Sequence, residues 1–107
     1  MKIDIPQIKQ VINLNEYAPE FGEAVIEVWV NPPRRILTVM DELSSRNLSE
    51  DDYHKAAEII GELWGCPAED VTRLIKHSQD TDPKLFEWLI YKTFVMIRDH
   101  RTQIKKN

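Results

Sequence analysis

The chain has 107 residues, of which 42% are hydrophobic and 30% are charged, with a formal net charge of −4. This composition is typical of one small globular domain and is too apolar for a disordered chain. Residues 1–97 carry 17 acidic and 10 basic side chains, whereas residues 98–107 carry one acidic and four basic ones. The acidic body argues against nucleic acid as a partner, because that affinity depends on neutralising phosphates.

Two strands are predicted at the N-terminal end, over 8–14 and 24–30. The second has the clearer alternation, which places Val28 and Trp29 on opposite faces. The connection contains proline and glycine, so antiparallel pairing is the simplest arrangement. An isolated hairpin is only marginally stable in water, and we therefore expect a helix or a second copy of the chain against it. Trp29 opposite Val28 indicates that both faces are covered.

Four helices are predicted after the strands. Pro33 cannot continue a β-ladder but fits the first turn of a helix. Ser49 is expected to cap the second helix, with acidic residues in its first turn, and Gly65 to end it. The polar stretch 78–81 is expected to be a loop. The expected helices lie near residues 33–45, 49–65, 68–77 and 83–101.

The last helix has the most informative sequence. Asp82 and Pro83 are typical of a helix start. Between residues 85 and 97 only three residues are polar, so the helix is apolar around most of its circumference. Such a helix must be covered on several sides, either as the central helix of a small bundle or partly by a partner. We expect Leu89 and Trp64 to be among the most buried side chains.

These elements predict an α+β fold that is mainly helical, in a single domain spanning 1–107. A β-rich part covers 1–31, a helical part covers 32–101, and a basic tail covers 102–107. The apolar run at 85–97 is too short and too charged to cross a bilayer, and the N-terminus lacks the apolar core of a signal peptide. A cytoplasmic location without a membrane partner is expected.

Catalytic and metal-binding patterns are absent from the sequence. The single cysteine, Cys66, excludes an intramolecular disulfide framework, and its acidic surroundings do not favour a thiolate. The three histidines match no metal-ligand spacing, and the three glycines form no phosphate-binding loop. We therefore expect a protein that is not an enzyme and that binds no cofactor or metal.

A surface that binds another protein is the hypothesis that the sequence favours. Tryptophan and tyrosine are enriched at interfaces, and an aromatic ridge follows helical spacing beside the residues expected to face the core. Two arginines after the prolines oppose the dipole at a helix start, which makes them candidate contacts to an acidic partner. A homo-oligomer is a further way to cover this surface. The candidate partner-binding residues are Trp88, Tyr91, Phe94, Val95, Val28, Arg34 and Arg35.

Several segments together resemble the tail assembly chaperones of long-tailed bacteriophages. They are Ile12-Asn13-Leu14-Asn15-Glu16-Tyr17, the strand ending in Trp29-Val30-Asn31-Pro32-Pro33, and the later Asp82-Pro83-Lys84-Leu85-Phe86-Glu87-Trp88-Leu89. The resemblance covers most of the chain.

The resemblance implies a non-enzymatic role in the host cytoplasm. Members of this family bind the long tape measure protein, keep its apolar helical segments in solution and deliver it for assembly of the tail tube. The tail tube protein is a further expected partner. Many members also have a longer form made by a ribosomal frameshift, and Lys105-Lys106-Asn107 could be encoded by a run of adenines. The alternative is a small helical adaptor or regulator that binds a single folded protein.

Overall fold

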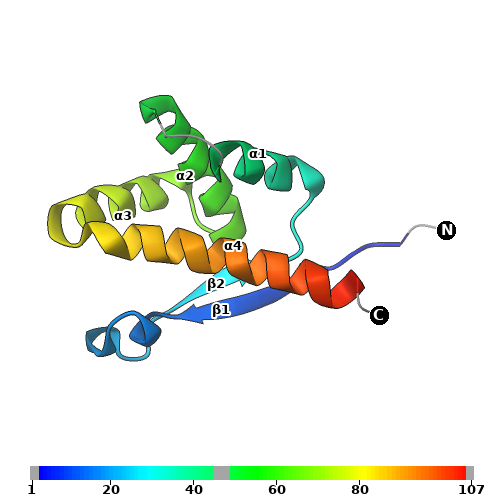
Figure 1. The fold of residues 1–107 in the computed structure, drawn as a ribbon, viewed down its shortest axis with the longest axis horizontal. Helices are drawn as coiled ribbons and strands as arrows, with labels where there is room; N and C mark the ends of the chain where they lie inside the picture. Colours follow the sequence, from blue (N-terminus) through cyan, green and yellow to red (C-terminus); the bar gives the residue numbers. More distant parts are fainter. Residues whose placement is uncertain (1–2, 45–48, 106–107) are drawn as a thin grey trace.

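A two-stranded sheet and four helices make up the fold, as predicted (Figure 1). The computed structural model describes residues 3–44 and 49–105. The strands β1 and β2 come first in the chain and are joined by two short 3-10 helices. The helices α1, α2 and α3 follow, and the last helix, α4, crosses the whole molecule in front of the sheet. The elements are β1 (Lys9–Asn13), η1 (Leu14–Glu16), η2 (Pro19–Phe21), β2 (Val25–Trp29), α1 (Arg34–Ser44), α2 (Glu50–Trp64), α3 (Ala68–Thr81) and α4 (Pro83–Lys105).

The antiparallel pairing of β1 and β2 places Ile12 opposite Ile26 and Asn13 opposite Val25. One face of the sheet packs on α2 and α4, and Ile12 and Val28 are fully buried there. On the other face Val11 and Val25 are about half exposed, with 48% and 51% of their surface accessible. Helices of the same chain thus stabilise the hairpin, and the expectation that both faces are covered is wrong.

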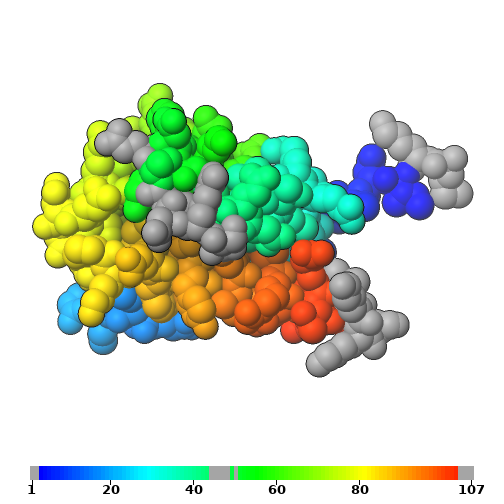
Figure 2. Space-filling view, turned by 45° about the horizontal axis from the view of Figure 1, so that its top comes forward, coloured from blue at the N-terminus to red at the C-terminus, as the bar shows by residue number. Residues whose placement is uncertain are grey.

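The segment before β1 is extended and anchored only near its end. Val30 donates its backbone N–H to the Ile8 carbonyl at 2.9 Å, and the Asn31 side chain bonds the backbone of both Ile8 and Pro6. Beyond that point Ile3 and Ile5 are exposed. Figure 2 shows this segment projecting away from the body of the molecule.

The second helix begins and ends where the sequence indicates. Ser49 and Asp52 form a reciprocal capping box, in which each side chain accepts a hydrogen bond from the other residue's backbone N–H. Gly65 ends α2 in the left-handed conformation at φ 70°. Gly61, one turn earlier, allows the close approach of the chain that follows, because a β-carbon there would lie 2.7 Å from the Cys66 carbonyl oxygen.

The third helix is longer than expected, because α3 continues through 78–81, where a loop was predicted. Ser78 is buried, and its hydroxyl donates to the Asp82 carbonyl at 2.6 Å while accepting from the Phe86 backbone N–H. These hydrogen bonds at the junction of α3 and α4 therefore offset the weak helix propensity of the polar residues. The helix ends only before Pro83, which disfavours a helical conformation in the residue before it.

The fourth helix packs on α3 and β1 and has four buried residues spaced four apart: Leu85, Leu89, Thr93 and Ile97. It is longer than predicted and continues to Lys105, so most of the expected basic tail is helical. Residues 106 and 107, at the end of the adenine-rich tract considered above, lie outside the described residues.

Leu89 is 1% exposed, as expected, but Trp64 is only half buried. The Trp64 indole N–H donates to the Thr93 hydroxyl at 3.1 Å, and this hydroxyl in turn donates to the Leu89 carbonyl at 2.8 Å. An indole ring needs a partner for its N–H, which favours a position at the margin of the core over its centre. Thr93 is fully buried, although the sequence pattern showed it as a polar interruption.

Candidate functional site: an apolar groove beside α4

The candidate site is an open groove along one side of α4, where the helix meets α1, α2 and α3. Its floor includes Phe86, Ile90 and Phe94, which are spaced four apart and lie one position after the buried stripe on the helix. All three are half buried. A helix with two adjacent apolar stripes can pack one on the core and leave the other at the surface.

The groove consists of three hollows. The first, of about 450 Å³, lies between α1 and the later turns of α4. The second, of about 230 Å³, lies between α1, α2 and the middle of α4, and every residue that lines it is apolar or aromatic. The third, of about 480 Å³, lies where α2 and α3 meet the first turns of α4.

Shared residues join these hollows into one surface. Met40 and Phe94 line both the first and the second hollow, and Tyr53, Phe86 and Ile90 line both the second and the third. At a rise of 1.5 Å per residue, the stretch of α4 from residue 86 to residue 98 is about 18 Å long. This length matches about three turns of a helix laid alongside.

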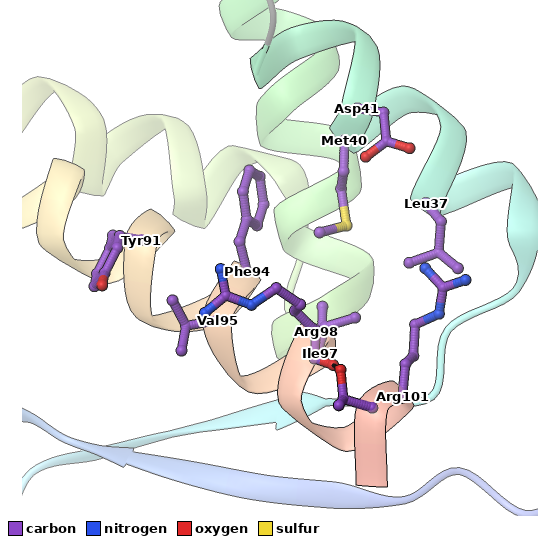
Figure 3. Close-up of a pocket in the computed structure, with 10 residues that line it drawn as sticks. Leu37, Met40, Asp41, Tyr91, Phe94, Val95, Ile97, Arg98 and Arg101 are labelled. Atoms are coloured by element: carbon purple, nitrogen blue, oxygen red, sulfur yellow. Dashed lines mark hydrogen bonds between the residues drawn. The ribbon is translucent and has the colours of Figure 1, made fainter. Parts of the chain in front are cut away.

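The first hollow has an apolar base between two arginines, shown in Figure 3. Leu37 and Met40 on α1 face Phe94 and Ile97 on α4 across it. In the same view Arg98 runs back along α4 toward Val95 and Phe94. Arg101 reaches from the next turn of α4 toward Leu37. Asp41, on α1, lies at the rim.

Three of the predicted partner-binding residues meet in this groove. Tyr91 and Val95 line the first hollow together with Phe94, and Tyr91 also lines the third. Tyr91 is 64% exposed, which is unusual for a large aromatic side chain. A ring held at the surface beside an apolar groove is typical of a contact residue.

Trp88 lies on another side of α4. Its ring packs on Tyr17 with centroids 5.3 Å apart, and the Lys92 ammonium lies 5.8 Å from its centroid. The Tyr17 hydroxyl donates to Asp82 at 2.6 Å, and Lys92 pairs with Glu16 at 2.9 Å. Trp88 thus helps to hold the connection between β1 and β2 against α4, and the outward ridge through Trp88 is not formed.

The other candidates lie elsewhere. Val28 is 0% exposed, because it is on the inner face of the sheet, so the prediction that it contacts a partner is wrong for this fold. Arg35 makes a bidentate ion pair with Glu62, with both N–O distances 3.0 Å. This pairing raises the pKa of Arg35 and lowers that of Glu62. Arg34 is exposed at the start of α1, away from the groove.

Sequence reasoning missed the walls of the groove. Phe86 and Ile90 have the same four-residue spacing as Phe94, so the helical period contained the signal for the floor. Met40, Tyr53 and Arg101 had no such signal, because they reach the groove only through the packing of α1, α2 and α4. Tyr53, on α2, is 40% exposed at the groove edge.

Reactive chemistry has little support in the described residues. Burial, followed by the nearby Asp70 charge, raises the pKa of the Cys66 thiol, which disfavours the nucleophilic thiolate. No group of three or more His, Cys, Asp or Glu in residues 3–44 and 49–105 could hold a metal ion. Among these same residues, none of the helices combines the length and apolar character that a bilayer crossing requires.

No protein-family model matches the chain, and no match was found among the curated proteins or the solved structures. The similarity to tail assembly chaperones therefore rests on the residues named above. The function is inferred from these residues and from the groove.

Proposed function

We propose that this chain is a non-enzymatic protein that binds an amphipathic helix of a partner protein in the groove beside α4. The observation that carries this proposal is the groove of three joined hollows, whose middle hollow is lined only by apolar and aromatic residues, with Tyr91 exposed at its edge. Helix-in-groove recognition needs an apolar floor of a few turns with polar residues at the margin. The groove has both features.

The resemblance to tail assembly chaperones suggests the partner. In this proposal the client is a tape measure protein, whose long helices have apolar stripes that aggregate when uncovered. Binding of such a stripe in the groove keeps it in solution in the host cytoplasm until the tail tube assembles, and the tail tube protein is a further proposed partner. No catalysis, cofactor or metal is needed for this role.

The first experiment tests the groove itself. The probe is a fluorescein-labelled synthetic helix of about 18 residues with a leucine stripe and an otherwise neutral polar face, and binding is followed by fluorescence anisotropy. The variant Val95→Lys places a charge in the first hollow and should weaken binding about tenfold or more, since burying an unpaired charge is costly. The matched control Val25→Lys places the same charge on the exposed face of the sheet and should leave binding unchanged.

Equal weakening by both lysine variants, or no binding of the peptide at all, would overturn the groove as the site. Circular dichroism of each variant separates loss of binding from loss of folding.

A second experiment separates a chaperone from an adaptor. Fragments of a tape measure protein are diluted from denaturant with and without this chain, and light scattering is recorded. A chaperone suppresses scattering by several unrelated helical fragments, and Val95→Lys loses this effect. An adaptor instead binds one folded protein at fixed stoichiometry and leaves the scattering of the fragments unchanged.

A further inference from the structure

The groove has different charges at its two ends. Arg98 and Arg101 lie beside the first hollow, near the end of α4, whereas Glu87 lines the third hollow, near the start of the helix. Nothing that lines the second hollow is charged. The groove is therefore apolar along its middle, basic at one end and acidic at the other.

The two arginines are available to a ligand. The Arg98 side chain is 71% exposed, and its ion pair with the adjacent Asp99 is long, at 3.7 Å. Exposed pairs of this kind contribute little. Arg101 is exposed and has no ion pair within the part of the chain that the structure describes. Figure 3 shows the two side chains lying on different sides of the same hollow.

Asp41 is the one carboxylate among the residues that line the first hollow, and it already makes an interaction of its own. Two guanidinium groups therefore face one carboxylate, so the positive charge predominates at this end. The basic end is also a local exception on an acidic protein with a net charge of −4. The acidic part of an approaching segment is consequently attracted to this end of the groove and repelled by most of the remaining surface.

We infer that the groove accepts its partner helix in one orientation, with the acidic end of that helix beside Arg98 and Arg101 and its basic end beside Glu87. The occupant is thus an amphipathic helical segment with an apolar stripe, carboxylates at one end of the helix and cations at the other end. This inference rests on the proposed function, because it specifies the ligand of the same groove. Complementary charges at the rim of an interface fix register and orientation more than they add affinity.

The orientation is measured by paramagnetic relaxation in NMR spectra of the full chain. The probe is a synthetic amphipathic helix of about 18 residues with a leucine stripe, glutamates in one terminal third and lysines in the other. A nitroxide attached at the glutamate end should broaden the backbone amide signals of residues 98–102. The same label attached at the lysine end should broaden those of residues 84–87.

Charge reversal tests the cause. The double variant Arg98→Glu plus Arg101→Glu should invert the broadening pattern. A second peptide carries terminal glutamates as its only charges. At low salt the double variant should bind this peptide about three- to tenfold more weakly than the wild-type chain does. The matched control, Arg34→Glu plus Arg73→Glu, changes the net charge by the same amount outside the groove and should alter neither result.

The outcomes distinguish this inference from the function on which it rests. If both labels broaden both ends equally, the peptide binds without a preferred orientation, and the inference fails while the groove stands as a binding site. If the orientation persists unchanged in the double arginine variant, these charges do not set it and the inference is also overturned. If no amide near α4 broadens with either label, the proposed function itself fails.

Discussion

At the scale of single residues, the clearest contrast is between Trp88 and Tyr91. They lie three positions apart on α4 and belong to the same predicted ridge, but their surroundings differ. Trp88 packs on Tyr17 beneath the connection between the strands, whereas the Tyr91 ring is mostly exposed beside the groove. Spacing on the helix placed them together, and the contacts of the folded chain separate a structural residue from a candidate binding residue.

This contrast predicts opposite effects of truncation. Trp88→Ala should lower the free energy of unfolding by about 2 kcal/mol, which is less than the value for a fully buried tryptophan because the ring is half buried. Tyr91→Ala should change stability by less than about 0.5 kcal/mol while weakening peptide binding. Urea denaturation and fluorescence anisotropy measure the two quantities. A stable Trp88→Ala protein that no longer binds the peptide would reverse this assignment.

At the scale of elements, two contacts set how the helices that wall the groove lie against their neighbours. The bidentate pair between Arg35 and Glu62 joins α1 to α2. The close approach of Gly61 to Cys66 joins the last turns of α2 to the start of α3. The Arg35–Glu62 pair joins residues that are far apart in the sequence, whereas Gly61 and Cys66 are five positions apart at the end of α2, where the Cys66 N–H donates to the Gly61 carbonyl at 2.9 Å.

Gly61 provides a test of that packing. Replacing glycine with alanine inside a helix normally stabilises it by about 0.5–1 kcal/mol. Here the added carbon would lie 2.7 Å from a backbone oxygen, so Gly61→Ala should instead destabilise the protein by about 1–3 kcal/mol. Thermal unfolding followed by circular dichroism gives the sign. A higher melting temperature would show that α2 and α3 are not packed this closely.

The ion pair between α1 and α2 predicts a dependence on pH. Because Arg35 lowers the pKa of Glu62 in the folded state, the stabilisation is present above the ordinary pKa of 4.5 and is lost as the pH falls through the lowered value. Wild-type protein should therefore be more stable than Glu62→Gln at pH 7, and this difference should shrink in acid below about pH 4. Urea denaturation at both pH values checks it, and a difference that grows in acid would contradict it.

At the scale of the whole molecule, uncovered apolar surface lies in more than one place. The groove beside α4 is one such surface, and the outer face of the sheet, with Val11 and Val25, is another. The first has a concave shape and charged ends, whereas the second belongs to a hairpin already stabilised by α2 and α4. We therefore expect the groove to be the surface that a second copy of the chain covers when no client is present.

Sedimentation velocity over a range of concentrations tests this expectation. The wild-type chain should form a homo-oligomer as its concentration rises, and the leucine-stripe peptide should dissociate it by competing for the groove. Tyr91→Lys should remain a monomer, whereas Val11→Lys should behave as the wild type does. An oligomer that is lost in Val11→Lys but kept in Tyr91→Lys would place self-association on the sheet instead.

The sequence by itself determined the local features of the fold. It indicated both strands, the capping of α2 by Ser49, its end at Gly65 and the start of α4 at Pro83, because these depend on neighbouring residues and on backbone geometry. The apolar circumference of α4 was also visible in the sequence, and so was the expectation that part of it stays uncovered.

Only the tertiary structure decided which part of α4 is covered. Periodicity shows which faces of a helix are apolar, but the covering segments come from distant positions along the chain. The connection around Tyr17 covers Trp88. Met40, on α1, lies beside Phe94 in the groove, although the two residues are more than fifty positions apart in the sequence. Burial depends on these long-range contacts, and residue spacing along one helix does not encode them.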